Sequence, residues 1–290
     1  MALIPQHFMN AVVAIGNRDP TGEISWVASG FFYGRTRSRN EADGTTAYST
    51  YLVTNKHVLQ GLSSPVVRAN PNGPEPAQEL PLGFVDQSTG DALWVEHPDP
   101  EVDVVVTGVN LSALNALGLQ LTFFPDNQSA SLSTMRSLGM SEADSVFLLG
   151  FPMGLVGGPR SAVVVRSGVI AQLQSALDGA AKSFMADGYV FPGNSGGPVV
   201  TKPEAMAIQG TQAVGSAHLV GIVASYIPYL DVAISAQTGR NRVVFEENSG
   251  LSNIFPVDAI EQTVDAFEVR HPSQSTETEP TADAPSLDDD

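Results

Sequence analysis

The chain has 290 residues, of which 42% are hydrophobic and 16% are charged, and its formal net charge at pH 7 is −17. Its length allows a full hydrophobic core in one or two domains. The acidity argues against nucleic acid as a partner, because phosphate binding needs clustered Lys and Arg. The sequence contains no cysteine, which excludes disulfides and thiol catalysis.

No run reaches the roughly 18 to 20 apolar residues of a membrane-spanning helix, so no membrane association is expected. The first eight residues, MALIPQHF, contain no basic region and no long apolar region. A secretory signal is therefore not visible, and the sequence favours a cytoplasmic location.

Short β-rich runs separated by Gly and Pro turns predict an all-β fold, because this pattern is typical of sandwiches and barrels. Between two groups of such runs, residues 111–140 are rich in Ser, Asn and Leu and contain the predicted domain boundary. The predicted strands are residues 24–32, 92–96, 102–109, 145–149, 162–166, 197–201 and 219–224.

The chain after the last predicted strand contains a helix and then an acidic tail. Val257, Ile260, Val264 and Phe267 recur at three and four residues and form one apolar stripe, which predicts a helix over 256–267 that packs on the body of the protein. A free amphipathic partner helix is the alternative. Residues 273–290 contain six acidic residues and no Lys or Arg. We therefore predict a disordered acidic tail over 271–290, with partner binding as its alternative role.

One string carries a candidate nucleophile. Residues 191–200 read FPGNSGGPVV, which puts the Ser195 hydroxyl between glycines on a tight turn before a β-branched run. A serine that attacks a carbonyl needs an exposed Oγ and adjacent backbone N–H groups to bind the developing oxyanion. Glycine at 193 lets its peptide N–H turn toward that oxyanion at little steric cost.

Two further strings upstream of Ser195 supply candidate partners. Residues 51–59, YLVTNKHVL, form an apolar strand that ends at His57, and residues 101–106, EVDVVV, place Asp103 at the start of an apolar strand. The order His, Asp, Ser along the chain is that of the chymotrypsin-type triad. Each residue also has an ordinary structural interpretation, as a histidine at a strand end or an aspartate at a turn.

At these residues the sequence resembles the trypsin-like serine peptidases, in particular bacterial members similar to the HtrA protease domain, and also the glutamyl endopeptidases. The strings that carry the resemblance are TNKHV at 54–58, VDVV at 102–105 and GNSGGP at 193–198. The resemblance covers about residues 8 to 250. The chain after the second predicted domain has no room for a PDZ module.

The resemblance implies two six-stranded antiparallel β-barrels with the active site in the cleft between them. The first barrel, residues 1–120, would hold His57 and Asp103, and the second, residues 121–270, would hold Ser195 and the terminal helix. The implied activity is serine endopeptidase cleavage of polypeptide substrates. His57 would act as base, Asp103 would orient it, Ser195 would be the nucleophile, and the N–H groups of Gly193 and Ser195 would form the oxyanion hole. No cofactor is needed.

Two other functions are consistent with parts of the sequence. A catalytically silent protease-fold binding module is the alternative function. The string around Ser195 also satisfies G-x-S-x-G, the nucleophile elbow of α/β-hydrolases. That elbow needs a helix directly after the serine, and GGPVV at 196–200 opposes one.

Metal catalysis is not expected. His7, His97, His218 and His271 have no second His or carboxylate at metal-ligand spacing, and no HExxH string occurs.

The resemblance places the specificity pocket in two stretches, before the serine and after the next strand. These stretches contain Tyr189, Val190, Ala224 and Tyr226 as substrate-binding candidates. Cleavage after Arg or Lys would use a carboxylate six residues before the serine, where this chain has Tyr189. Asp187 lies two residues earlier and is interpreted as a turn residue. A glutamyl endopeptidase would have a histidine where Val223 stands. The pocket should therefore accept a small to medium uncharged side chain.

Overall fold

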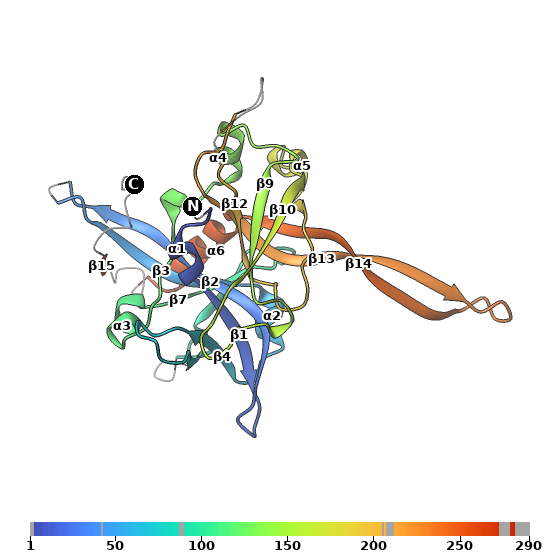
Figure 1. The fold of residues 1–290 in the computed structure, drawn as a ribbon, viewed down its shortest axis with the longest axis horizontal. Coiled ribbons are helices and arrows are strands. Elements are labelled where there is room, and N and C mark those ends of the chain that lie inside the picture. The colour runs from blue at the N-terminus through green and yellow to red at the C-terminus, as the bar shows by residue number, and fades with distance from the viewer. Residues whose placement is uncertain are drawn as a thin grey trace.

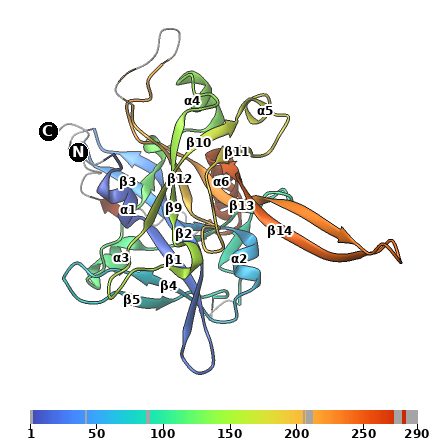
Figure 2. The ribbon, with the colours of Figure 1, turned by 45° about the vertical axis from the view of Figure 1, so that its right-hand side comes forward.

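The computed structural model describes residues 3–41, 43–86, 90–204, 206, 212–272 and 279–281. The chain folds into an antiparallel sheet and a closed barrel, which pack against each other with a C-terminal helix beside both (Figures 1 and 2). Among the described residues, no helix is long and apolar enough to cross a membrane.

The N-terminal sheet has the strand order β5-β4-β1-β2-β3-β7-β6, with β8 beside β2 and β15 beside β3. Its strands are β1 (Val12–Arg18), β2 (Ile24–Arg39), β3 (Thr46–Thr54), β4 (Pro65–Ala69), β5 (Gln78–Pro81), β6 (Trp94–Glu96), β7 (Val105–Gly108), β8 (Phe124–Pro125) and β15 (Glu279–Thr281).

This sheet is open, whereas the sequence predicted a closed six-stranded barrel. The two terminal strands, β5 and β6, contain four and three residues and do not pair with each other. Pro81 at the end of β5 has no N–H to add to a ladder. In the connection between β5 and β6, the only β-pairing formed by the described residues is an isolated bridge between Val85 and Ala92. Strands this short leave the two ends of the sheet apart.

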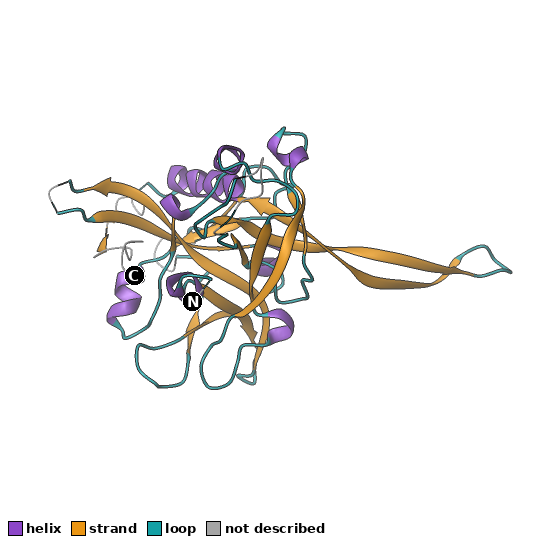
Figure 3. Cartoon of the chain, turned by 45° about the horizontal axis from the view of Figure 1, so that its top comes forward, coloured by secondary structure: helices purple, strands orange, loops and turns teal. Residues whose placement is uncertain are grey.

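The C-terminal half forms a closed barrel in the order β10-β11-β14-β13-β12-β9, as the sequence predicted for this half. Its strands are β9 (Ser145–Gly150), β10 (Val164–Gln172), β11 (Phe184–Asp187), β12 (Pro198–Thr201), β13 (Leu219–Ile234) and β14 (Asn241–Pro256). Strand β13 is longer than predicted and leaves the barrel together with β14 as a long hairpin (Figure 3).

The helices are short except for the last. They are α1 (Gln6–Asn10), α2 (Lys56–Gln60), α3 (Leu111–Ala116), α4 (Leu132–Ser137), α5 (Gln174–Leu177) and α6 (Val257–Arg270), with 3-10 turns η1 (Asp126–Gln128) and η2 (Pro152–Gly154). The predicted C-terminal helix is confirmed as α6, which contacts β6 and β7 of the sheet and β13 and β14 of the barrel.

Helix α6 is anchored to the sheet by its apolar stripe and by an ion-pair network. Phe267 is 1% exposed, and its ring meets the ring of Tyr51 edge to face at a centroid distance of 5.5 Å. Arg37 pairs with Glu268, which also accepts the Tyr51 hydroxyl at 2.9 Å. Burial and the neighbouring Glu268 carboxylate raise the pKa of Tyr51 to about 12. The phenol therefore stays protonated and keeps its role as a donor.

Most of the predicted tail lies outside the described residues. Within it, residues 279–281 form β15, which pairs antiparallel with Thr46–Tyr48 of β3. Strand β7 pairs only with Tyr51–Thr54 of β3, so the other part of that edge is open to a backbone partner. Edge pairing uses main-chain groups rather than apolar side chains, so an acidic segment with little to bury can still add a strand to the sheet.

The predicted domain boundary, between residues 120 and 121, lies just before β8, which pairs with β2.

Truncation of Phe267 tests how strongly α6 holds the two halves together. We expect Phe267→Ala to lower the free energy of unfolding by about 3–5 kcal/mol, because it leaves a cavity between α6 and the sheet. Val269→Ala, on the same helix but 84% exposed, is the matched control and should change it by less than about 0.5 kcal/mol. Equal effects in urea unfolding would show that α6 is not a core element.

Candidate active site

His57 lies in the first turn of α2, directly after the buried strand β3. Thr54, the last residue of β3, is fully buried and its hydroxyl donates to the carbonyl of Ser29 at 2.8 Å. Asn55 follows and its amide donates to the carbonyl of Asp103 at 2.6 Å. These two contacts fix the end of β3 and the loop of Asp103 together, while the His57 side chain remains 50% exposed.

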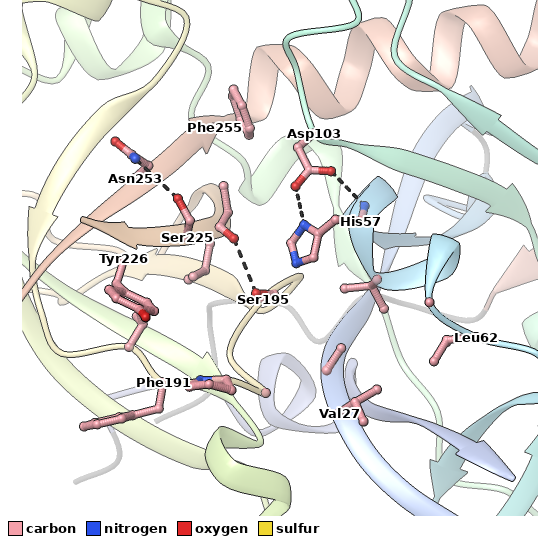
Figure 4. A pocket seen from close by; sticks show the side chains of 18 of the residues that line it. Val27, His57, Leu62, Asp103, Phe191, Ser195, Ser225, Tyr226, Asn253 and Phe255 are labelled. Atoms are coloured by element: carbon pink, nitrogen blue, oxygen red, sulfur yellow. Dashed lines mark hydrogen bonds and ion pairs between the residues drawn. The ribbon is translucent and has the colours of Figure 1, made fainter. Parts of the chain in front are cut away.

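Asp103 holds His57 through both carboxylate oxygens (Figure 4). One oxygen accepts the backbone N–H of His57 at 3.0 Å, and the other pairs with ring Nδ1. Burial acts to raise the pKa of Asp103, but hydrogen bonds from the ring and backbone of His57 outweigh it, so the net pKa lies below its ordinary value. When Nδ1 carries the proton toward Asp103, Nε2 of the neutral ring is an acceptor.

Ser195 lies on a turn that only glycines can complete. Gly193 and Gly196 have φ of +101° and +82°, a region that favours glycine. A Cβ at Gly193 would lie 2.3 Å from the Phe151 carbonyl, and one at Gly196 would lie 2.2 Å from the Ser29 carbonyl. The Ser195 hydroxyl donates to the Ala224 carbonyl at 3.3 Å.

The buried hydroxyl of Ser29 connects this turn to the N-terminal sheet. Its Oγ donates to the Gly193 carbonyl at 2.6 Å and accepts the Phe151 N–H at 2.9 Å. The backbone N–H of Ser29 donates to the carbonyl of Ser195 at 2.9 Å. A residue of β2 therefore holds the peptide that precedes Asn194 and the peptide that follows Ser195.

The peptide before Gly193 is oriented by η2. Met153 has a left-handed φ of 55°, and its N–H donates to the Pro192 carbonyl at 2.6 Å. In a trans peptide the carbonyl and the following N–H point in opposite directions. The Gly193 N–H therefore points away from Met153.

A cavity of ≈ 860 Å³ joins these groups. His57, Asp103, Gly193 and Ser195 line it, and apart from His57 and Asp103 its lining among the described residues carries no charged side chain. Apart from Gly193 and Ser195, the wall that the barrel half contributes consists of Ser183, Val190, Phe191, Pro192, Val223, Ala224, Ser225, Tyr226, Asn253 and Phe255. This wall is apolar with a few neutral hydrogen-bonding groups.

Seven of the eight predicted site residues line this one cavity, and Tyr189 does not. The Tyr189 ring is 50% exposed, lies over Phe191 at a centroid distance of 6.4 Å, and faces Gly250. Asp187 belongs to β11 and pairs with Leu251 of β14. Within the described part of the chain, no three His, Cys, Asp or Glu side chains lie close enough to hold a metal ion.

Sequence reasoning missed Ser29 and Asn253. Ser29 stands between Ala28 and Gly30 in a predicted strand, and its partner Gly193 is 164 residues away. The sequence around Ser29 contains no motif that predicts a contact with Gly193. Phe191 and Ser225, in contrast, lie in the two stretches where the resemblance placed the specificity pocket, and both line the cavity.

A family model described as a trypsin-like peptidase domain matches residues 12–205, more than half of the chain. No match was found among the curated proteins. Among solved structures, the apo crystal structure of the MamO protease domain from Magnetospirillum magneticum is similar, with 17% sequence identity and a TM-score of 0.46. The match covers 88% of this chain and 96% of that one.

Removal of the Ser29 hydroxyl tests whether it holds the turn. We expect Ser29→Ala to lower the free energy of unfolding by about 1–3 kcal/mol, because the Gly193 carbonyl and the Phe151 N–H both lose a buried partner. Ser25→Ala, at an exposed position of the same strand, should change it by less than about 0.5 kcal/mol. Indistinguishable denaturation midpoints for the two variants would refute this role.

Proposed function

The chain belongs to the family of trypsin-like peptidases, and we propose that it is a serine endopeptidase that hydrolyses peptide bonds of polypeptide substrates. The observation that carries the proposal is the double hydrogen bond between Asp103 and His57 in the cavity that Ser195 also lines. A carboxylate that holds the ring at Nδ1 leaves Nε2 to accept a proton.

In the proposed reaction, Ser195 Oγ attacks the carbonyl carbon of the scissile peptide while His57 Nε2 takes the hydroxyl proton. Asp103 keeps the ring in this tautomer and stabilises the imidazolium that forms. The imidazolium then protonates the leaving amine, and the C–N bond breaks. Water, deprotonated by His57, hydrolyses the resulting ester and restores Ser195.

The oxyanion of each tetrahedral intermediate would be bound by the N–H groups of Gly193 and Ser195. The contact between Met153 and the Pro192 carbonyl supports this role, because it turns the Gly193 N–H away from η2. The loss of one oxyanion donor typically costs on the order of 3 kcal/mol of barrier.

One observation favours the alternative of a catalytically silent binding module. The Ser195 hydroxyl donates to the Ala224 carbonyl rather than to His57, so it must rotate before it can donate its proton to His57. Such rotations of accessible side chains take picoseconds to nanoseconds, far less than a catalytic cycle. The contact with Ala224 is therefore compatible with an active enzyme, and reactivity decides between the two functions.

Covalent labelling tests Ser195 as the nucleophile. We expect a fluorophosphonate to add one adduct to the wild-type chain, and Ser195→Ala and His57→Ala to abolish labelling, because only an activated serine reacts. Ser133→Ala, an exposed serine of α4, is the control and should label normally. Intact-mass spectrometry measures the adduct. An unlabelled wild type that is folded would support the binding module instead.

The neutral wall of the cavity predicts the substrate preference. We expect peptides with Ala, Val or Leu before the cut to be cleaved roughly 100-fold more efficiently than those with Arg, Lys or Glu, because the pocket offers no partner for a buried charge. Profiling with a peptide library, read by mass spectrometry, measures kcat/KM for each residue. Preferred cleavage after a charged residue would overturn this pocket assignment, while leaving the nucleophile untouched.

A further inference from the structure

The hairpin formed by the outer parts of β13 and β14 projects from the barrel as an isolated two-stranded ribbon (Figures 1 and 3). We call residues 228–248 the ribbon. Its strands pair from Pro228 with Asn248 to Ile234 with Asn241. Seven large apolar side chains of the ribbon are between 37% and 63% exposed: Tyr229, Leu230, Val232, Ile234, Val243, Val244 and Phe245.

A ribbon of this composition is unusual on a monomer. A lone two-stranded hairpin is at best marginally stable in water, and a contiguous exposed apolar patch marks a contact surface. The exposed apolar residues lie next to one another along both strands, rather than being scattered over the molecule. The ribbon is therefore expected to be covered by a partner.

The pairing of the strands divides the ribbon into two faces, because residues directly opposite each other share a face and successive residues alternate. We call one of them the aromatic face. It contains Tyr229 with Glu247, Asp231 with Phe245, Ala233 with Val243, and Ser235 with Arg240. The opposite face contains Leu230 with Glu246, Val232 with Val244, and Ile234 with Asn241.

Of the three charges on the aromatic face, Glu247 and Arg240 are arranged symmetrically about its centre, and the third, Asp231, lies opposite Phe245. Glu247 lies opposite Tyr229, which is three residues before Val232 in β13. Arg240 lies opposite Ser235, which is three residues after Val232. With a rise of about 3.3 Å per residue, each charge lies about 10 Å from the centre. The two charges have opposite signs, and the apolar residues lie between them.

We propose that the aromatic face binds the same face of a second copy of this chain, with the two ribbons antiparallel about a two-fold axis across the Val232 position. Such an axis places β14 on β14, so that Arg240 of each copy meets Glu247 of the other. The same operation packs Phe245 on Val243 and sets the Tyr229 hydroxyl near Ser235. Asp231 faces the small side chain of Ala233 and keeps its carboxylate at the rim. The surface is self-complementary, as a two-fold interface requires.

Two observations select this face and this partner. On the opposite face, the Glu246 carboxylate accepts the hydroxyl of Tyr226, so it already has a hydrogen-bond partner within the chain. A lipid bilayer is the other apolar environment that could cover the ribbon. It cannot satisfy the open backbone edges of two strands, and the charged Arg240 lies next to the ribbon's tip. A second ribbon leaves those edges and charges accessible to water.

Sedimentation velocity of the full chain, from about 1 to 100 µM, tests the proposal. We expect a concentration-dependent dimer, and we expect Phe245→Glu to raise its dissociation constant by about 100-fold. Val244→Glu is the matched control, because it changes the next residue, of similar exposure, on the opposite face. It should change the constant by less than about threefold. Circular dichroism verifies that both variants fold.

Charge exchange then tests the antiparallel arrangement. We expect Arg240→Glu and Glu247→Arg each to weaken the dimer by about 10-fold, and the double variant to restore wild-type affinity to within about threefold, because it recreates both ion pairs. A wild type that is monomeric throughout overturns the proposal. So does a dimer that is insensitive to Phe245→Glu, one disrupted equally by Val244→Glu, or one not rescued by the exchange. A monomer that binds lipid vesicles through Phe245 would point to a membrane instead.

Discussion

The candidate active site depends on the buried contact between Ser29 and the turn that carries Ser195. Ser29 belongs to β2 of the open sheet, whereas Gly193 and Ser195 belong to the barrel half of the chain. Its hydroxyl holds the peptide before Asn194, and its backbone N–H holds the peptide after Ser195. The turn can approach β2 this closely because Gly196 has no Cβ to meet the Ser29 carbonyl. The relative position of the two halves and the conformation of the turn are therefore set by the same atoms.

A neutral residue also orders the turn from within. Asn194 is fully buried, and its side-chain oxygen accepts the Phe191 N–H at 3.0 Å. A carboxylate in this position would carry a buried charge and would need a cation beside it. The amide needs none, so the turn is held by neutral hydrogen bonds from Asn194, Ser29 and Met153. The two bonds of the Ser29 hydroxyl are buried, and a low local dielectric constant strengthens buried hydrogen bonds.

The sequence predicted those features whose signal is local. The strings around His57, Asp103 and Ser195 each combine a strand with a polar residue at its end. The apolar stripe at 257–267 identified α6 through its helical period. The open N-terminal sheet was not predicted, because closure depends on whether β5 and β6 meet, and neither strand encodes its partner.

The missed features share a physical origin in contacts between distant segments. Ser29 has no local signature, since its role arises from a partner 164 residues away. The extension of β13 and β14 was missed because Pro228, Asn248 and Gly250 resemble turn residues in sequence. In the structure, the register shifts between Tyr226 and Pro228 absorb them within the hairpin. Strand pairing overrides local propensity there.

Strand β13 runs from the cavity, which Ala224 and Tyr226 line, into the ribbon, which begins at Pro228. An extended substrate could therefore pair with the open edge of β13 in the cavity. Pro228 has no N–H, and a register shift precedes it, so a ladder along this edge cannot continue past Tyr226. A substrate of the proposed peptidase would therefore pair only with the residues beside Ser195. The ribbon beyond Pro228 can contact a partner through its side chains.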